Sequence, residues 1–410
     1  MMKQIYSIKE NFNSFLFGII YFIHINIIGA VYVGEIISII YLIFSIRKIT
    51  ISNEIKLLIK ITAIYMLIVL ISDVYNSNSI NNFIKGFTAP LLILFSIIFL
   101  FNFFKDRKKL FLMFIFGGFF LKLFLVFNFT ELLRESDNPW KWGLGVYSIS
   151  LIYLFELLLD KKFSIGKILI INLLFLVISL YFASRGLSLI VIISTIFFLN
   201  SRSKNNFLKL FQYKSTFLII PVLILLFIIL FSFMNKVTNN FIFFDKLNKK
   251  NELQRNNNSN ILFSARPEFY IYSSAFIAKP FFGHGSYPRD INLYYRSKLN
   301  FYLYDNYIIN FLPKIELDKL YSNEIPTHSY IFESLIAHGL FSIIYWLVIS
   351  YTIIKTYSIY ASQMSLFYHL KIIIFCYSLF FSPFNFIERL NLEILISLLI
   401  LNFRMKTNYD

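Results

Sequence analysis

The sequence predicts an all-α, polytopic integral membrane protein with about 12 transmembrane helices. The first observation behind this prediction is composition, because 58% of the 410 residues are hydrophobic and 15% are charged. Soluble domains are about a quarter charged, so this chain has too few charges to cover a surface that faces water. The second observation is the recurrence of long apolar runs. Together the two exclude an ordinary globular enzyme, a disordered chain and a coiled coil.

The apolar runs give the individual spans. A hydrocarbon core about 30 Å thick requires roughly 20 apolar helical residues. The first two runs are nearly continuous, and we divide them at Asn26–Gly29, where a hairpin can turn. No A-x-A cleavage site follows the first run, so we expect it to be a retained anchor. The predicted spans are 10–26, 28–46, 57–74, 83–102, 110–128, 143–159, 166–182, 187–200, 215–234, 329–353, 369–384 and 390–403.

The distribution of basic residues orients these spans. With the N-terminus inside, we count 20 of the 39 Lys and Arg residues in inside tails and loops, Lys371 among them. The short outside loops contain five, which are Lys85, Arg134, Lys141, Arg185 and Arg389. This excess on one side follows the positive-inside rule. The net charge of +17 is therefore explained by membrane topology, and we expect no nucleic-acid partner.

Three regions follow from this topology. Residues 1–234 form an N-terminal transmembrane bundle of about nine helices, and residues 327–410 form about three more. Between them, residues 235–326 form the only long hydrophilic stretch, an outside loop that carries short surface helices.

The middle of the long loop changes from polar to aromatic and apolar. We expect a short helix at 270–277, which ends at Lys279-Pro280 because the residue before a proline avoids the helical region. The glycine-rich sequence 281–285 then predicts a turn that is closed by Pro288. The tyrosine-rich segment 290–320 predicts two or three further surface helices.

Two arginines on the outside are candidates for phosphate binding. Arg185 lies between two apolar runs with hardly any loop, and an arginine at bilayer depth usually marks a functional site. Arg266 lies where the long loop becomes apolar. Guanidinium groups bind phosphate in a bidentate manner, so the pair can bind a diphosphate. The alternatives are a snorkelling arginine at 185 and an ion pair with Glu268 at 266.

His328 is the candidate general base. It lies at the outer start of a predicted span, where the helix dipole favours the neutral imidazole that a base requires. The alternative is a histidine at the interface that has no role in chemistry. Glu333 is a carboxylate within the same predicted span, about 140° around the helix from His328. For His338, which precedes Gly339, we favour a packing or capping role.

Arg389, in the last outside turn, is a third candidate cation, which can bind substrate or pair with Glu388. The sequence contains no phosphate-binding loop and no Rossmann fingerprint, and its five histidines are scattered. We therefore expect no metal and no cofactor. The single cysteine, Cys376, excludes an internal disulfide framework.

The order of these motifs resembles the O-antigen ligase/polymerase superfamily. Ser184-Arg185-Gly186 precedes the long outside loop, and Arg266 is followed by Lys279-Pro280-Phe281-Phe282-Gly283-His284-Gly285, which is similar to the family's P-x-x-G-x-G. Pro326-Thr327-His328-Ser329, Glu333 and His338-Gly339 resemble the motif that ends the loop. The turn at 382–389 is similar to that of some polymerase-like members.

The resemblance implies an activity and a location. Such enzymes work at the periplasmic face of the bacterial inner membrane and take a glycan from undecaprenyl diphosphate, without metal or nucleotide. Arg185 and Arg266 would neutralise the departing diphosphate and His328 would deprotonate the acceptor hydroxyl, with inversion at the anomeric carbon. Arg389, Glu333, Gly283 and Gly285 would bind the diphosphate or the glycan.

The acceptor distinguishes three hypotheses. A polymerase, our leading hypothesis, transfers the glycan to another lipid-linked glycan and extends a surface polysaccharide. A ligase transfers it to lipid A–core. A transporter of lipid-linked oligosaccharide is a more distant alternative, because such folds often contain repeated halves and this sequence shows no similarity between its halves.

Overall fold

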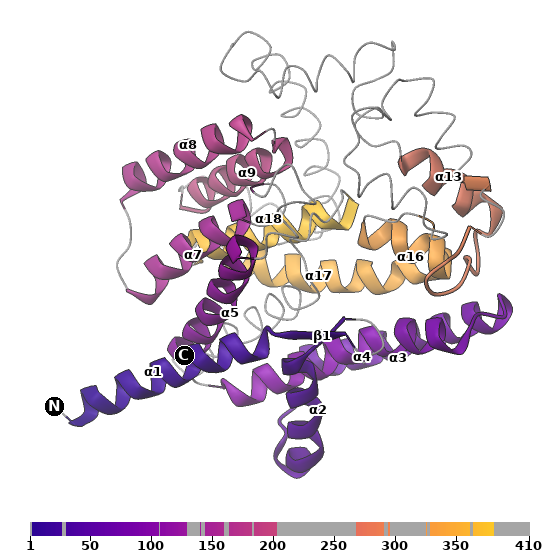
Figure 1. The fold of residues 1–410 in the computed structure, drawn as a ribbon, viewed down its shortest axis with the longest axis horizontal. Helices are drawn as coiled ribbons and strands as arrows, with labels where there is room; N and C mark the ends of the chain where they lie inside the picture. The colour runs from indigo at the N-terminus through magenta and orange to yellow at the C-terminus, as the bar shows by residue number, and fades with distance from the viewer. Residues whose placement is uncertain are drawn as a thin grey trace, which may run out of the picture.

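The computed structural model describes residues 2–26, 30–105, 107–128, 140, 144–159, 164–182, 184–202, 268–290, 294–295, 325, 329–360 and 364–380. These residues are almost all helical, apart from two short strands (Figure 1). The elements are α1 Met2–Tyr21, β1 His24–Asn26, β2 Ala30–Tyr32, α2 Val33–Ser45, η1 Ile46–Lys48, α3 Asn53–Tyr75, α4 Ile80–Phe103, α5 Lys108–Asn128, α7 Gly145–Leu158, α8 Ile165–Tyr181, α9 Arg185–Arg202, α13 Glu268–Ala278, α16 Tyr330–His338, η6 Leu340–Ser342, α17 Ile343–Tyr360 and α18 Leu366–Phe380.

Within the described residues, three helices are long and apolar enough to cross a membrane. They are α3, α4 and the segment Leu340–Ser358, which includes η6 and most of α17. Shorter apolar helices occur at Gly145–Leu158, Ile165–Tyr181, Gly186–Ser201 and Leu366–Phe380. These helices confirm the predicted all-α membrane architecture, whereas the number of about 12 spans stays a prediction. The predicted spans 215–234 and 390–403 lie outside the described residues.

Two short antiparallel strands flank the predicted division at Asn26–Gly29. Strands β1 and β2 pair in antiparallel fashion with His24 opposite Tyr32. The chain then enters α2 at once, and the buried Glu35 carboxylate accepts a hydrogen bond from the Tyr32 backbone N–H at 2.9 Å. Glu35 thus satisfies the backbone donor of the N-cap residue, and the Ile23 carbonyl accepts from the Val33 N–H at 2.9 Å.

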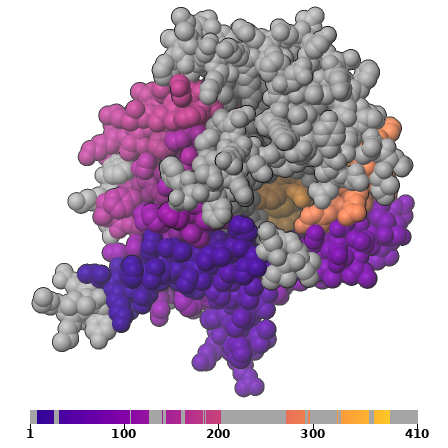
Figure 2. Space-filling model, in the orientation of Figure 1, coloured from indigo at the N-terminus to yellow at the C-terminus, as the bar shows by residue number. Residues whose placement is uncertain are grey.

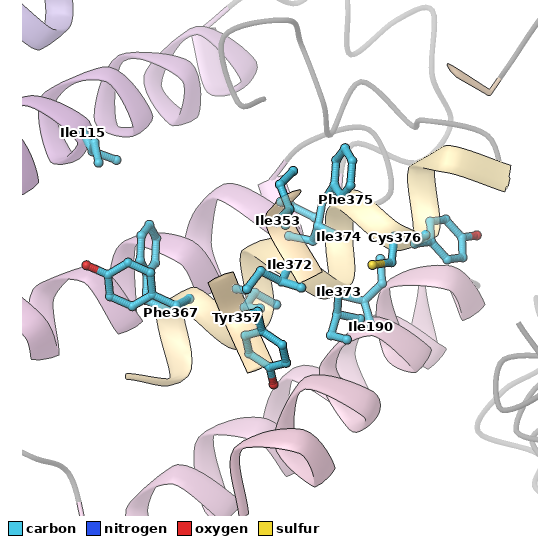
Figure 3. Close-up of a cluster of buried hydrophobic side chains, with 14 of the residues drawn as sticks. Ile115, Ile190, Ile353, Tyr357, Phe367, Ile372, Ile373, Ile374, Phe375 and Cys376 are labelled. Atoms are coloured by element: carbon cyan, nitrogen blue, oxygen red, sulfur yellow. The ribbon is translucent and has the colours of Figure 1, made fainter. Parts of the chain in front are cut away.

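Helix α18 forms the centre of the core. All its residues from Leu366 to Leu379 are buried, which is typical of a helix surrounded by others rather than by lipid. It packs along α9 and also contacts α7, α16 and α17. Figure 3 shows its isoleucines beside Ile190 of α9 and Ile353 and Tyr357 of α17.

Lys371 was counted as a basic residue of an inside loop, and the structure corrects this. It lies within α18, is buried, and its Nζ lies 4.1 Å from the centroid of the Phe119 ring and 5.6 Å from that of Phe367. The helix begins three residues earlier than the predicted span, so Lys371 falls on its second turn. The cation–π contact partly replaces the hydration that burial removes.

The predicted span 329–353 is also wrong as a single helix, because the chain reverses at Gly339. Tyr330 stacks on Trp346 with ring centroids 4.5 Å apart. In one continuous helix these residues would lie about 24 Å apart. Gly339 permits the reversal with φ of +75°, a region that side chains other than glycine rarely adopt. Helices α16 and α17 are therefore an antiparallel pair.

Candidate functional site

The end of α3 carries the polar residues around which the site is built. This helix is a candidate membrane span, yet its last turn contains Ser72 and Asp73, and Asn76 and Asn78 follow it. Ser72 and Asp73 are buried. Buried polar groups in such a place must find partners within the protein. They find them in the loop after α13 and in the end of α16.

The loop at residues 279–289, which we call the glycine loop, confirms the predicted turn. Helix α13 ends at Ala278, directly before Lys279-Pro280, as expected. The backbone N–H groups of His284 and Gly285 donate to the carbonyls of Ile336 (2.8 Å) and Ala337 (2.7 Å). Both carbonyls belong to the last turn of α16, where no intrahelical donor is available. The glycine loop therefore caps the C-terminal end of α16.

The candidate glycines Gly283 and Gly285 make this contact possible. Both have positive φ, at +62° and +84°. A Cβ atom on Gly283 would lie 2.4 Å from the Ala337 carbonyl oxygen, and one on Gly285 would lie 2.8 Å from Asn78 Nδ2. Both residues are buried. The structure thus brings these two glycines against protein backbone and the polar end of α3.

Side chains from α3 fasten the loop in place. The single hydroxyl hydrogen of Ser72 is shared between the carbonyls of Phe282 (2.5 Å) and Ala337 (2.9 Å), which joins loop and helix at one point. Asn76 Nδ2 donates to the Gly283 carbonyl at 3.1 Å, and Lys279 Nζ donates to Asn76 Oδ1 at 2.5 Å. The loop is therefore held by side-chain bonds as well as by backbone bonds.

Asp73 is the centre of the buried polar cluster. Its Oδ1 accepts from the Ser286 backbone N–H (2.6 Å) and from Asn78 Nδ2 (2.7 Å), and its Oδ2 accepts from Ser286 Oγ (2.8 Å). Ser286 Oγ also lies 3.1 Å from His338 Nε2. Three donors from two segments thus converge on one carboxylate.

His338 continues the cluster into α17, which confirms the expected packing role. Its Nδ1 lies 3.1 Å from Tyr65 Oη, which in turn lies 3.4 Å from Ser334 Oγ. Trp346 Nε1 donates to the same Ser334 oxygen at 2.6 Å. All these side chains are buried.

His284 is the second histidine of the region, and it serves the loop. Its Nε2 lies 2.9 Å from the Ala275 carbonyl oxygen, which can only accept, so Nε2 carries the hydrogen. Burial lowers the pKa of His284 below its usual value, which Lys279 also favours, whereas the Ala275 hydrogen bond and Asp290 act in the opposite direction. The neutral imidazole ties the loop back to α13.

Helices α13 and α16 lie side by side and point the same way. Near their first turns, Tyr272 stacks on Phe332 with ring centroids 5.1 Å apart. Near their last turns, His284 joins the Ala275 carbonyl to that of Ile336. Their N-terminal ends are therefore neighbours.

Glu333 has an exposed side chain, although its neighbours Ile331 and Ser334 on α16 are buried, and it lies deep enough between the surrounding elements that burial raises the pKa of its carboxyl to about 7. Figure 2 shows a recess that reaches the gold segment containing α16 and α17, bordered among the coloured residues by α13 in orange and by α3 and α4 in purple. A carboxylate on an exposed face of α16 is available to a ligand.

Of the other candidates, Arg185 is the first residue of α9, and the structure describes its backbone position. Arg266, His328 and Arg389 lie outside the described residues. Helix α13 begins two residues after Arg266, and α16 begins two residues after His328.

The starts of α9 and α16 both lie far from the residues that pack around His369 of α18. Phe198 of α9 and Tyr357 of α17 both contact His369 near the beginning of α18, with ring centroids 5.5 and 5.3 Å away. From this contact, Arg185 lies about 20 Å back along α9, and Trp346 about 17 Å back along α17. Trp346 stacks on the first residue of α16, and α16 contacts α18. The first residue of α9 and the start of α16 thus both lie well away from the His369 contact.

Sequence reasoning missed Asp73, Ser286 and Tyr65. Asp73 could have been found from the sequence, because a carboxylate within an apolar span is uncommon and usually has a specific partner. Ser286 and Tyr65 carry no such signal, since serine and tyrosine are common in this chain. Among the described residues, no three His, Cys, Asp or Glu side chains are grouped so that they could hold a metal ion.

Apolar helices of spanning length, joined to a helical hairpin that a glycine loop caps, define the chain as a polytopic helical membrane protein. Residues 168–347 match the family model described as O-antigen ligase. This match supports the predicted resemblance to the O-antigen ligase/polymerase superfamily for the segment that carries the motifs from Ser184 to Gly339, whereas the turn at 382–389 lies outside the matched residues. No curated protein and no solved structure matches the chain.

Proposed function

We propose that the chain is a metal-independent, inverting glycosyltransferase at the periplasmic face of the bacterial inner membrane. It transfers a glycan from undecaprenyl diphosphate to another lipid-linked glycan, and so extends a surface polysaccharide. The observation that carries the proposal is the parallel pairing of α13 and α16. It makes neighbours of the two helix starts that directly follow Arg266 and His328.

The proposed reaction exchanges one bond at the anomeric carbon for another. The bond from that carbon to the diphosphate oxygen breaks, and a bond to the acceptor oxygen forms on the opposite face. His328 takes the proton of the acceptor hydroxyl. Arg185 and Arg266, with Arg389, stabilise the charge that develops on the leaving diphosphate. Glu333, exposed on α16, would accept hydrogen bonds from sugar hydroxyls.

The glycine loop supports this arrangement without contacting the reacting atoms. Gly283 and Gly285 let the backbone close onto the end of α16. Their contribution to binding is then to hold α13 and α16 in one register. Such positioning is worth several kcal/mol in catalysis, because reacting groups must meet in a defined geometry.

The test is transfer by purified protein with a lipid-linked oligosaccharide donor, measured as free undecaprenyl diphosphate released in detergent. We expect Arg185→Ala, Arg266→Ala and His328→Ala each to lose most of the activity, with each arginine contributing on the order of 2–4 kcal/mol to transition-state stabilisation. Arg289→Ala is the matched control for the arginines, since Arg289 is exposed on the glycine loop, and His24→Ala is the control for His328. Wild-type rates in all three variants would refute the site.

The ligase remains a second candidate because the matching family model is described as O-antigen ligase. A deletion strain separates the two. Loss of a polymerase leaves lipid A–core that carries one repeat, whereas loss of a ligase leaves long polymer on the lipid carrier. A transporter would release no undecaprenyl diphosphate in detergent, so the purified-protein assay also tests that alternative.

A further inference from the structure

We propose that Asp73 is a positioning residue for this transferase. Its carboxylate sets the direction of one chain of hydrogen bonds that joins α3, the glycine loop, α16 and α17. The proposal rests on the proposed function, because the elements that it fixes are those that would carry Arg266 and His328.

The direction of the chain begins at the carboxylate, which accepts hydrogen bonds and donates none. Ser286 Oγ–H therefore donates to Asp73 Oδ2 at 2.8 Å. Because its only proton is used there, Ser286 Oγ must accept from His338 Nε2 at 3.1 Å. A neutral His338 is thus the tautomer with hydrogen on Nε2.

The tautomer of His338 also fixes the direction of its hydrogen bond to Tyr65 of α3. In this tautomer Nδ1 is an acceptor, so it receives the Tyr65 O–H at 3.1 Å. Tyr65 Oη can then accept from Ser334 at 3.4 Å, and Ser334 Oγ accepts from Trp346 Nε1–H at 2.6 Å. Every bond of the chain points from α17 toward Asp73.

The pairing of every group in this hydrogen-bond chain depends on the Asp73 carboxylate at its end. Asp73, Ser286 and His338 are 3%, 1% and 6% exposed, so water does not replace a lost partner. Removal of the carboxylate would also leave the Ser286 backbone N–H without its acceptor, and Asn78 Nδ2 would keep only its bond to the Ser286 carbonyl. Buried networks hold a structure firmly when every member is paired, and they lose this property when one is not.

Loss of the Asp73 carboxylate would change the position of α13 relative to α16. The glycine loop links the end of α13 to the end of α16, and Ser286 and His338 are the points where Asp73 holds each. A shift of the loop would therefore move one helix start relative to the other. A misplacement of about 1 Å between reacting groups can cost about 100-fold in rate.

Asp73→Asn gives the discriminating variant. Its carbonyl oxygen can still accept from the Ser286 N–H and from Asn78, and its amide N–H can donate to Ser286 Oγ. Ser286 would then donate to His338 Nε2, His338 would carry its hydrogen on Nδ1, and Tyr65 would donate to Ser334. The bonds between Asp73 and Ser334 all reverse, whereas Trp346 Nε1, which can only donate, keeps its bond to Ser334, and the Ser334 hydroxyl hydrogen loses Tyr65 as its acceptor. In Asp73→Ala the Ser286 backbone N–H has no acceptor whichever way the chain runs, and Ser286 Oγ loses its bond to the carboxylate.

The first measurement is the tautomer of His338 in full-length protein labelled with nitrogen-15 histidine, because the two ring nitrogens shift differently when protonated. His338→Gln identifies the signal. We expect hydrogen on Nε2 in the wild type and on Nδ1 in Asp73→Asn. The same tautomer in both proteins would overturn the proposal, and this readout does not depend on activity.

The second measurement is transfer kinetics. We expect Asp73→Ala to lower kcat about 10- to 100-fold, with the KM for the donor nearly unchanged, and Asp73→Asn to stay within about threefold of wild type. Thr62→Ala is the control, since Thr62 is equally buried on α3 and takes no part in this chain. A wild-type rate in Asp73→Ala, or equal losses in Asp73→Ala and Asp73→Asn, would overturn the positioning role. If Asp73→Ala does not fold, the tautomer in Asp73→Asn decides.

The two proposals fail in different ways. No transfer by the wild-type protein, with an inverted tautomer in Asp73→Asn, would refute the proposed function and with it the role of Asp73 in transfer. Normal transfer by the wild type, with an unchanged rate in Asp73→Ala, would refute the positioning role alone.

Discussion

Replacement of Gly339 by alanine tests whether the reversal between α16 and α17 depends on a glycine. Gly339 has φ of +75° and ψ of −170°, a combination essentially restricted to glycine. A Cβ atom there would lie 2.1 Å from the Phe281 carbonyl oxygen and 2.3 Å from its carbon, both of which are backbone atoms. The backbone conformation costs about 1–3 kcal/mol, and the overlap costs about as much again. A loss of only 2 kcal/mol would lower the ratio of docked to released loop about 30-fold.

The assay for this substitution reports on the contact between α13 and α16. A cysteine placed at Ala275, which is fully buried, would be shielded from a maleimide as long as α13 stays docked. The only native cysteine, Cys376, is buried and is replaced by alanine in this background. We expect Gly339→Ala to raise the labelling rate at least tenfold and to lower transfer activity in parallel.

Gly166→Ala is the matched control. A Cβ on Gly166 would meet nothing within 4 Å, and this residue lies in the regular helix α8. Alanine there should be neutral or stabilise the protein by up to about 1 kcal/mol. If Gly339→Ala labels as slowly as Gly166→Ala and transfers glycan normally, then neither the backbone conformation nor the close approach at Gly339 matters, and the reasoning fails.

Two further predictions concern buried ionisable groups. Burial lowers the pKa of His284, so the docked loop binds fewer protons than the released loop; its stability is complete above about pH 6.5 and falls as the pH drops below that value. The thermal midpoint should therefore decrease between pH 7.5 and 5.5 by more in the wild type than in His284→Gln, and equal decreases would contradict the prediction. For Lys371, replacement by methionine should leave the thermal midpoint unchanged or raise it, because burial of an ammonium group costs more than contact with the Phe119 ring returns. A lower midpoint would show that the ammonium group stabilises the core.

The spans were the most predictable part of the fold, because length and apolarity are local properties. Predicted spans 57–74 and 83–102 correspond to α3 and α4 within a few residues at each end. In both cases a serine N-cap, Ser52 or Ser79, precedes the helix. Its side chain accepts a hydrogen bond from the backbone N–H of the residue three positions later. Apolar periodicity and local capping are sufficient for such helices.

The reversal at Gly339 could not be read from hydropathy. Residues 329–353 are apolar enough to read as one span, and the break depends on a contact between Gly339 and Phe281, which is 58 residues earlier in the chain. The cluster at Asp73 was hidden for the same reason. Its partners come from residues 286 and 338, and no single window of sequence contains them.

The motif order on which the family resemblance rests acquires a physical meaning from these contacts. A Cβ on Gly283 would collide with the backbone of Ala337 and His338, and a Cβ on Gly339 would collide with the backbone of Phe281 and Phe282. The two glycines therefore permit the same approach from opposite sides, so a side chain at either position separates the loop from α16. The glycine of the P-x-x-G-x-G-like segment and the glycine that ends α16 are thus two halves of one contact. Because that contact also brings Ser286 to His338, the direction set by Asp73 can reach α16 only while both glycines remain.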